Sequence, residues 1–185
     1  MTAPAPAPGT ATRPGIDPRG PRFGAGVTAV VLLVVIALAL AGGTPAALAD
    51  RLGQPAFVLF AAQTLVFAWG AFAGIRRHPY GVLFARLVRP RLAPPAELED
   101  PAPPTFAQGV GFIVSLAGIV LHIAGVPFGL VGAAAAAFVA AFLNSVFAYC
   151  LGCQIFLLLV RLGIIRARGA APAGSHLGSR HGSHL

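Results

Sequence analysis

Four long apolar stretches dominate this chain, and polar or proline-rich segments separate them. They cover about 23–41, 55–75, 106–125 and 128–160, and none of them contains Asp or Glu. A helix of ~20 apolar residues crosses a bilayer core of ~30 Å, so each stretch is long enough to span a membrane. The pattern predicts an all-α membrane protein with four transmembrane helices, arranged as two hairpins.

The last apolar stretch is longer than one membrane span requires. A straight helix over its roughly 33 residues would be ~50 Å long, at a rise of ~1.5 Å per residue. We therefore expect a long fourth helix that overhangs the membrane. The alternative is a span followed by a second segment at the membrane surface.

The remaining segments set the domain organisation. Residues 1–15 are rich in Ala and Pro, and 167–185 repeat Gly-Ser-His-Leu, so we expect disordered ends around a transmembrane domain at 16–166. Between the second and third spans, residues 81–89 alternate apolar side chains with Arg and predict a short helix on the membrane surface. Residues 93–104 are rich in Pro and predict an extended linker.

The first apolar stretch has a second interpretation as a signal peptide. Ala47, Leu48 and Ala49 precede Asp50 in the pattern of a cleavage site. The basic lead-in and the apolar run are both long for a signal peptide, which favours a retained span. The topology of the later spans is the same in both interpretations.

The composition excludes a soluble globular domain. Hydrophobic residues make up 57% of the chain and charged residues 10%, against roughly 25% charged in soluble domains. The mean hydropathy is +0.82. The net charge of +8 does not indicate nucleic-acid binding, because the basic residues are not interleaved with aromatic residues as a stacking surface requires.

The positions of the arginines predict the orientation. All thirteen basic residues are Arg, and only Arg51 lies in the two connections that follow the first and third spans. Because Arg accumulates on the cytoplasmic side of membrane proteins, both termini and the 76–104 connection are expected in the cytoplasm, with the protein in the plasma membrane. The other arginines are Arg13, Arg19, Arg22, Arg76, Arg77, Arg86, Arg89, Arg91, Arg161, Arg166, Arg168 and Arg180.

Two cysteines, Cys150 and Cys153, are the candidate chemical site. Residues three apart share a helix face with Cβ atoms ~5–6 Å apart, whereas a disulfide needs ~3.8 Å, so a bridge in a regular helix would be reversible. Apolar packing and metal binding are the alternatives, although zinc needs about four ligands. A helix that ended near the cysteines would disfavour a thiolate, and only a break at Gly152 would place a helix start at Cys153.

The polar residues inside the spans are expected to hydrogen-bond within the bundle. His122 is the one ionisable residue among them, and we expect it near the outer face, in a structural role away from the cysteines. The absence of Asp and Glu argues against a proton-driven pump built on buried carboxylates. The other residues of this kind are Gln63, Thr64, Ser115, Asn144 and Ser145.

Three stretches resemble the Domain of Unknown Function 4395 family of bacterial membrane proteins. They are IDPRGPRF at 16–23, HPYGVLFARLVRPRLAPPAELEDPAPPTFAQ at 78–108 and NSVFAYCLGCQIFLLL at 144–159. No biochemical activity is established for that family. Its genes often lie near those of thioredoxin-like proteins and rhodanese-type sulfurtransferases. The resemblance implies that Cys150 and Cys153 match the paired cysteines of the family.

The resemblance implies a membrane partner of soluble thioredoxin-like or rhodanese-type proteins. In this hypothesis Cys150 and Cys153 form a redox pair for thiol–disulfide or sulfur-transfer chemistry, and the sequence does not say which cysteine attacks. We expect no cofactor and no metal site, and the residues leave open whether the protein is an enzyme. The alternative is a non-enzymatic scaffold, or a carrier of small solutes or sulfur anions lined by polar residues of the spans.

Overall fold

The computed structural model describes residues 15–165. The expected disorder at 1–15 and 167–185 falls outside this range, apart from Gly15. Within the described residues the chain is all-helical, with a single isolated bridge between Ile16 and Glu99.

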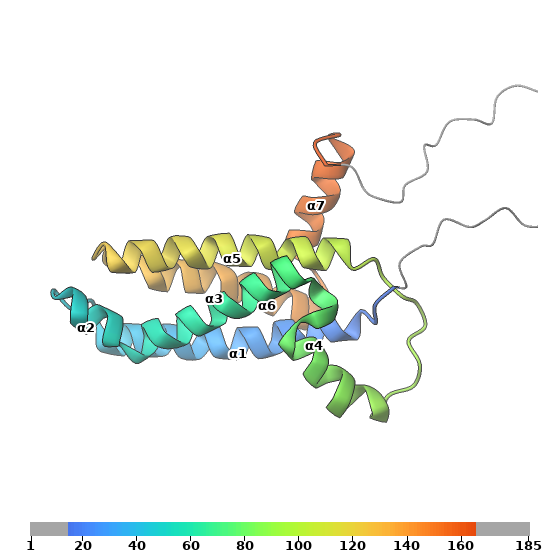
Figure 1. The fold of residues 1–185 in the computed structure, drawn as a ribbon, viewed down its shortest axis with the longest axis horizontal. Coiled ribbons are helices and arrows are strands. Elements are labelled where there is room, and N and C mark those ends of the chain that lie inside the picture. The colour runs from blue at the N-terminus through green and yellow to red at the C-terminus, as the bar shows by residue number, and fades with distance from the viewer. Residues whose placement is uncertain (1–14, 166–185) are drawn as a thin grey trace, which may run out of the picture.

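Four long helices form the body of the molecule (Figure 1). They are α1 (Arg19–Gly42), α3 (Pro55–Ala73), α5 (Ala102–Ile123) and α6 (Gly129–Phe147). Each is long and apolar enough to cross a membrane, which confirms the prediction of four long apolar helices and fits a multi-pass membrane protein. Helix α1 packs against α3 and α6, and α5 packs against the same two helices.

Few side chains are buried inside the bundle, and its outer surface is apolar. Large side chains such as Leu65 and Phe72 are 71% and 81% exposed, which suits contact with lipid rather than water. Small residues bring the helices together: a Cβ atom on Gly118 of α5 would collide with Ala133 of α6. The buried core cluster contains Leu32, Val35, Phe60, Phe67, Leu130, Ala134 and Ala137.

The last apolar stretch forms two helices, so the expected length of a single fourth helix is not confirmed. Helix α6 ends at Phe147, and α7 begins at Leu151 and runs to Arg161. Helix α7 stands out sideways from the bundle and packs against α5 and α6 (Figure 1). The alternative of one span followed by a separate segment therefore describes the chain here.

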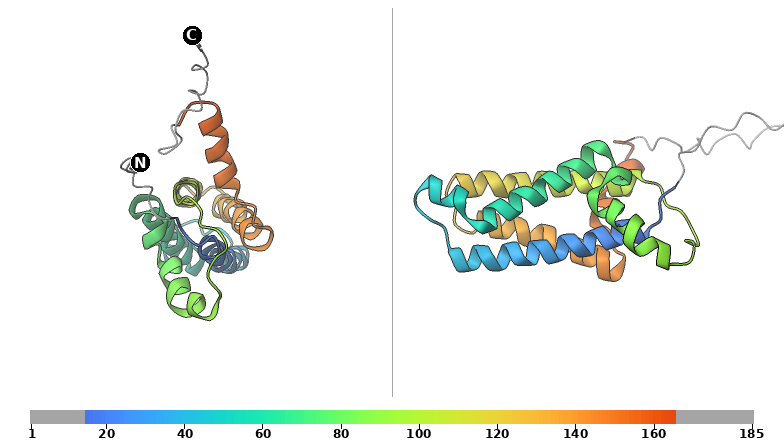
Figure 2. Two further views of the ribbon diagram at one scale, coloured as in Figure 1. Left: turned by 90° about the vertical axis from the view of Figure 1, so that its right-hand side faces the viewer. Right: turned by 60° about the horizontal axis from the view of Figure 1, so that its bottom comes forward.

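A second helical segment leaves the same end of the bundle. It consists of the short helices α4 (Pro79–Leu83), η2 (Phe84–Val88) and η3 (Arg89–Arg91), preceded by η1 (Ile75–Arg77). This is where the sequence predicted a surface helix. Figure 2 shows, in the view along the bundle, that this segment and α7 project to different sides.

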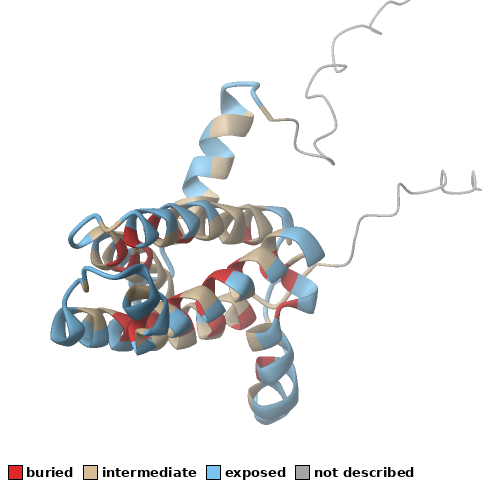
Figure 3. Ribbon diagram, turned by 60° about the vertical axis from the view of Figure 1, so that its left-hand side comes forward, coloured by how far each residue is buried: buried red, intermediate tan, exposed pale blue. Residues whose placement is uncertain are grey.

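Of the two projecting segments, only α7 is free of buried residues (Figure 3), since Phe84 of η2 is buried. Buried residues gather between the bundle helices, whereas α7 contains none. The opposite end of the bundle carries α2 (Leu48–Gly53) and the turn after α5. Because η1 to η3 and the start of α1 hold most of the described arginines, the fold gathers them at one end of the molecule.

Candidate functional site

Helix α6 ends through a left-handed turn directly before the cysteines. Ala148 has φ 55° and ψ 24°, a conformation that non-glycine residues seldom adopt. The N–H groups of Ala148 and Tyr149 both reach Leu143 O, and the Tyr149 bond is 3.2 Å long. These bonds satisfy one of the last carbonyl groups of α6, as a C-terminal capping motif does. The turn frees the following residues to start a new helix.

Cys150 is the N-cap residue of α7. Its backbone is extended, with φ −85° and ψ 99°, and its Sγ accepts a hydrogen bond from the Cys153 N–H at 3.3 Å. Its carbonyl accepts the first helical bond, from the Gln154 N–H at 3.0 Å. The first N–H groups of a helix lack partners within the helix, so a side-chain acceptor at the N-cap satisfies one of them. One interpretation of the sequence places both cysteines within one regular helix. In the structure a new helix instead starts at the cysteine pair.

Cys150 and Cys153 are joined as a disulfide, with their Cα atoms 5.2 Å apart. Cys150 lies just before the regular part of α7, whereas Cys153 lies in its first turn. Both cysteines are partly exposed. Within residues 15–165 no group of three or more His, Cys, Asp or Glu side chains lies close enough to hold a metal ion.

Helix α7 is fixed to the first turns of α5 by a close backbone approach. A Cβ atom on Gly152 would lie 2.5 Å from Ala107 Cβ and 2.6 Å from Ala107 Cα. The rings of Phe106 and Phe156 pack beside this contact, with centroids 5.6 Å apart. Gly152 therefore lets α7 pack closely against α5. The break that the sequence associated with Gly152 lies earlier, at 148–150, where no glycine marks it.

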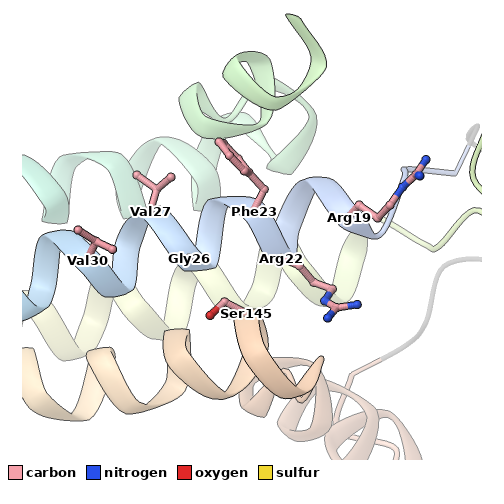
Figure 4. A pocket seen from close by; sticks show the side chains of 7 residues that line it. All are labelled: Arg19, Arg22, Phe23, Gly26, Val27, Val30 and Ser145. Carbon is pink, nitrogen blue, oxygen red and sulfur yellow. The ribbon is translucent and has the colours of Figure 1, made fainter. Parts of the chain in front are cut away.

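A shallow groove lies between α1 and α6, next to the turn that leads to Cys150. Arg22 reaches from α1 toward the C-terminal end of α6, where Ser145 lines the groove (Figure 4). A Cβ atom on Gly26 would lie 3.7 Å from Ser145 Cβ, so the two helices are in contact here. The groove thus presents positive charge near the approach to the cysteine pair.

Comparison with known protein families matches residues 16–161 to a family described as Domain of unknown function (DUF4395). The chain belongs to the DUF4395 family. The matched range holds the four bundle helices and α7, including both cysteines. Comparisons with curated proteins and with solved structures give no match.

In this DUF4395 chain His122 lies at the opposite end of the bundle from the cysteines. It is 5% exposed, stacks on Phe57 and makes a 3.2 Å hydrogen bond between Nε2 and Arg51 O. The Arg51 guanidinium in turn donates to Ile123 O at 2.7 Å and to Ala46 O at 3.0 Å. The predicted structural hydrogen bond of His122 is thus present, and it joins α5 to Arg51 of α2, whose guanidinium caps the end of α5.

Two of the other polar residues of the spans make side-chain hydrogen bonds within the bundle. Gln63 accepts a 2.9 Å hydrogen bond from the Tyr80 hydroxyl, and Thr64 donates to Phe60 O at 2.8 Å. Ser115 is fully buried, and its hydroxyl has no partner within the described residues. The lining proposed for a carrier thus consists in part of side chains already occupied by structural hydrogen bonds.

Sequence reasoning missed a second polar group, built around Asp17, His78 and Gln108. Asp17 Oδ1 accepts from Arg19 N at 3.0 Å and Nε at 2.9 Å, and the opposite carboxylate oxygen lies 2.8 Å from the guanidinium. This hydrogen-bonded pairing lowers the pKa of Asp17. His78 and Gln108 both end in buried, unpartnered atoms. A signal was present, since these residues lie within two of the stretches that resemble the family.

Proposed function

We propose that this protein is a membrane-bound thiol–disulfide exchange partner of soluble cytoplasmic proteins, acting through Cys150 and Cys153. The observation that carries the proposal is the position of Cys150 at the start of α7, where its Sγ accepts the N–H of Cys153. Thioredoxin-like or rhodanese-type proteins are the partner class implied by the sequence resemblance. In this proposal the bundle forms two hairpins, α1 with α3 and α5 with α6.

The helix start favours a thiolate at Cys150. Unpaired N–H groups and the aligned peptide dipoles give a helix N-terminus about half a positive charge, which stabilises an anion placed there. Thiolates rather than thiols are the nucleophiles in disulfide exchange, and cysteines at helix N-termini hold the thiolate more readily. Cys153 lies inside the first turn, so we assign attack to Cys150 and resolution to Cys153.

Thiol–disulfide exchange with the partner proceeds in two nucleophilic displacement steps. The Cys150 thiolate attacks one sulfur of a partner disulfide, forming a mixed disulfide and releasing the other partner sulfur as a thiolate. The Cys153 thiolate then attacks Cys150 Sγ, closing the Cys150–Cys153 bond and releasing the second partner thiolate. The partner gains two electrons and two protons in total, and the membrane dithiol is oxidised by the same two electrons.

Sulfur transfer would use the same residues with a persulfide in place of the disulfide. The Cys150 thiolate attacks the outer sulfur of a partner persulfide, takes that sulfur as a Cys150 persulfide and releases the partner thiolate. Attack by Cys153 on Cys150 Sγ would then release hydrogen sulfide and form the disulfide. The two reactions differ in their product, because only the second releases sulfide.

The cytoplasmic face suits this chemistry. Soluble thiol partners are kept reduced in the cytoplasm, so a reversible pair can exchange electrons with them. The arginines of α1 and of η1 to η3 lie at the same end of the bundle as α7, and the positive-inside rule assigns that end to the cytoplasm. Exposed apolar side chains of α7, such as Leu158, would then rest in the membrane interface.

Trapping with a purified thioredoxin tests the proposal. The Cys153→Ser variant keeps the attacking thiol and loses the resolving one, so it should accumulate a mixed disulfide with oxidised thioredoxin. Cys150→Ser should give far less adduct, and the double variant should give none. The wild-type pair should equilibrate with redox buffers at a potential on the order of −200 to −270 mV.

The absence of adducts in the trapping experiment would rule out the redox function. If neither single variant forms an adduct under conditions where a known dithiol protein does, the cysteines have a structural role alone. The scaffold or carrier then remains as the function. Sulfide release from a persulfide donor, measured with the same variants, separates sulfur transfer from disulfide exchange.

A further inference from the structure

A second cavity lies at the Arg-rich end of the bundle, and the thiol chemistry does not use it. It has a volume of about 310 Å³ and lies where the start of α1 meets η1, α4, η2 and α5. The bridge between Ile16 and Glu99, with bonds of 2.8 and 2.9 Å, holds the N-terminal lead-in against the linker beside it. Its size falls at the lower end of the range for small-molecule sites, which begins at about 300 Å³.

Two buried polar atoms in the lining have no partner within the described residues. His78 is 3% exposed and its Nε2 is unpartnered, and Gln108 Oε1 is also buried without a hydrogen bond. Leaving a polar atom buried and unsatisfied costs on the order of 1–3 kcal/mol. The two side chains lie beside each other, and Gln108 partly offsets the effect of burial on the pKa of His78. Because neither atom completes a hydrogen bond to the other, a ligand that bonds to both would remove this cost.

The neighbouring residues hold both side chains in place. A Cβ atom on Gly70 would lie 2.7 Å from His78 Cδ2 and 2.7 Å from Gln108 Cγ, so both side chains pack over this glycine of α3. The Tyr80 ring contacts the His78 ring edge to face, with centroids 5.2 Å apart. The Tyr80 hydroxyl is anchored on Gln63. Side chains and backbone of α3, α4 and α5 therefore hold the site in place.

The charges around the cavity favour an anion. Arg76 and Arg89 line it and are exposed, and no hydrogen bond or ion pair to their side chains is found among residues 15–165. Asp17 also lines it, but its carboxylate is paired with Arg19. Burial lowers the pKa of His78, so near neutral pH this residue acts as a neutral hydrogen-bonding group.

We propose that this cavity binds a phosphate ester of a small polyol. The phosphate would face Arg76 and Arg89, because guanidinium groups pair with phosphate oxygens through two parallel hydrogen bonds. Hydroxyl groups of the polyol would donate to and accept from His78 and Gln108. An anionic phospholipid headgroup and soluble glycerol 3-phosphate share this chemistry.

Binding measurements on the full chain in nanodiscs distinguish the two sources. One arm titrates glycerol 3-phosphate onto protein in phosphatidylcholine nanodiscs, and the other measures retention of phosphatidylglycerol from mixed nanodiscs by native mass spectrometry. Retention of phosphatidylglycerol alone identifies a lipid site, and binding of glycerol 3-phosphate alone identifies a soluble ligand. The proposal fails if neither probe binds the wild-type protein above the phosphatidylcholine background.

Charge-matched variants test whether binding depends on the cavity residues or only on the overall positive charge of this end of the bundle. Arg76→Gln with Arg89→Gln should weaken binding about tenfold or more, whereas Arg77→Gln with Arg91→Gln removes equal charge outside the cavity and should change it less than about twofold. Gln108→Leu keeps every charge and should also weaken binding, with helix content unchanged. Equal losses in the two double variants, or no loss in Gln108→Leu, would overturn the proposal.

Discussion

The backbone N–H of Cys153 donates a hydrogen bond to Cys150 Sγ across 3.3 Å. In the reduced protein the same geometry should favour a thiolate at Cys150, because its sulfur lies at the helix start while Cys153 lies inside the first turn. We expect Cys150 in the Cys153→Ser variant to react with monobromobimane about ten times faster near pH 7 than Cys153 in the Cys150→Ser variant. Equal rates, or a faster Cys153, would contradict the assignment of roles.

The contact between α7 and α5 leaves no room for a side chain at Gly152. The Gly152→Ala variant would place a methyl group 2.5 Å from Ala107 Cβ, so α7 must shift away from α5. Overpacking of this kind costs roughly 1–3 kcal/mol, and the cysteines should become more accessible to alkylation. Gly132→Ala is the matched control, because a Cβ atom there has nothing within 4 Å. Thermal unfolding in detergent and thiol labelling measure both effects.

The spanning helices could be predicted from the sequence, whereas the turn before the cysteines could not. Apolar stretches of sufficient length leave few alternatives to membrane helices, since the lipid requires every backbone polar group to be bonded internally. The end of α6 carries no such signal in the sequence, because Ala148 is a good helix former. The nearby Gly152 suggested a helix break four residues too late. The left-handed turn at Ala148 leads into a helix that packs against α5, a tertiary contact that no local pattern shows.

The cavity at His78 and Gln108 also could not be predicted from the sequence. His78 and Gln108 lie thirty positions apart, and His78 is followed by Pro79, so its local sequence indicates only a helix start. The two side chains meet because Gly70 of α3 lets both pack against the same point. Long-range juxtaposition of this kind follows from the helix packing and is invisible to spacing along the chain.

The orientation of the bundle can be tested at the linker between α4 and α5. With both termini and this linker in the cytoplasm, a Pro95→Cys variant in a background without Cys150 and Cys153 should resist membrane-impermeant maleimide in intact cells and react after lysis. A cysteine at Thr44, between α1 and α2, should show the reverse. Labelling of position 95 from outside would invert the topology and place the cysteine pair on the outer side.

Acid should destabilise the protein through His78. Burial lowers the pKa of His78 in the folded state below its ordinary value of 6.5. As the pH falls through about 6.5, the unfolded chain takes up a proton there before the folded protein does, so stability present above this pH is lost below it. The fall in melting temperature between about pH 7.5 and pH 5.5 should be smaller in His78→Gln than in the wild type. Parallel pH profiles would show that His78 does not contribute.

Two glycine substitutions, one inside α6 and one directly after it, test whether the chain turns at Ala148 or continues as one long helix. Ala148 has φ 55°, a left-handed conformation that costs a residue with a Cβ atom on the order of 1–2 kcal/mol. Ala148→Gly removes that cost, so the variant should be about as stable as the wild type or slightly more stable. Ala141→Gly, inside α6, should instead lose about 0.5–1 kcal/mol.

A continuous helix through 148 predicts a different result. Both glycines would then lie in a helix interior, and both variants should lose similar stability in mixed-micelle unfolding experiments. The thiol reactivity of the Cys153→Ser background adds a second measurement. With the turn in place, Ala148→Gly should preserve the fast reaction of Cys150, because the helix start that stabilises its thiolate is unchanged. Similar destabilisation by both glycines, with slow alkylation at Cys150, would mean that α6 continues through the cysteines and that their activation has another origin.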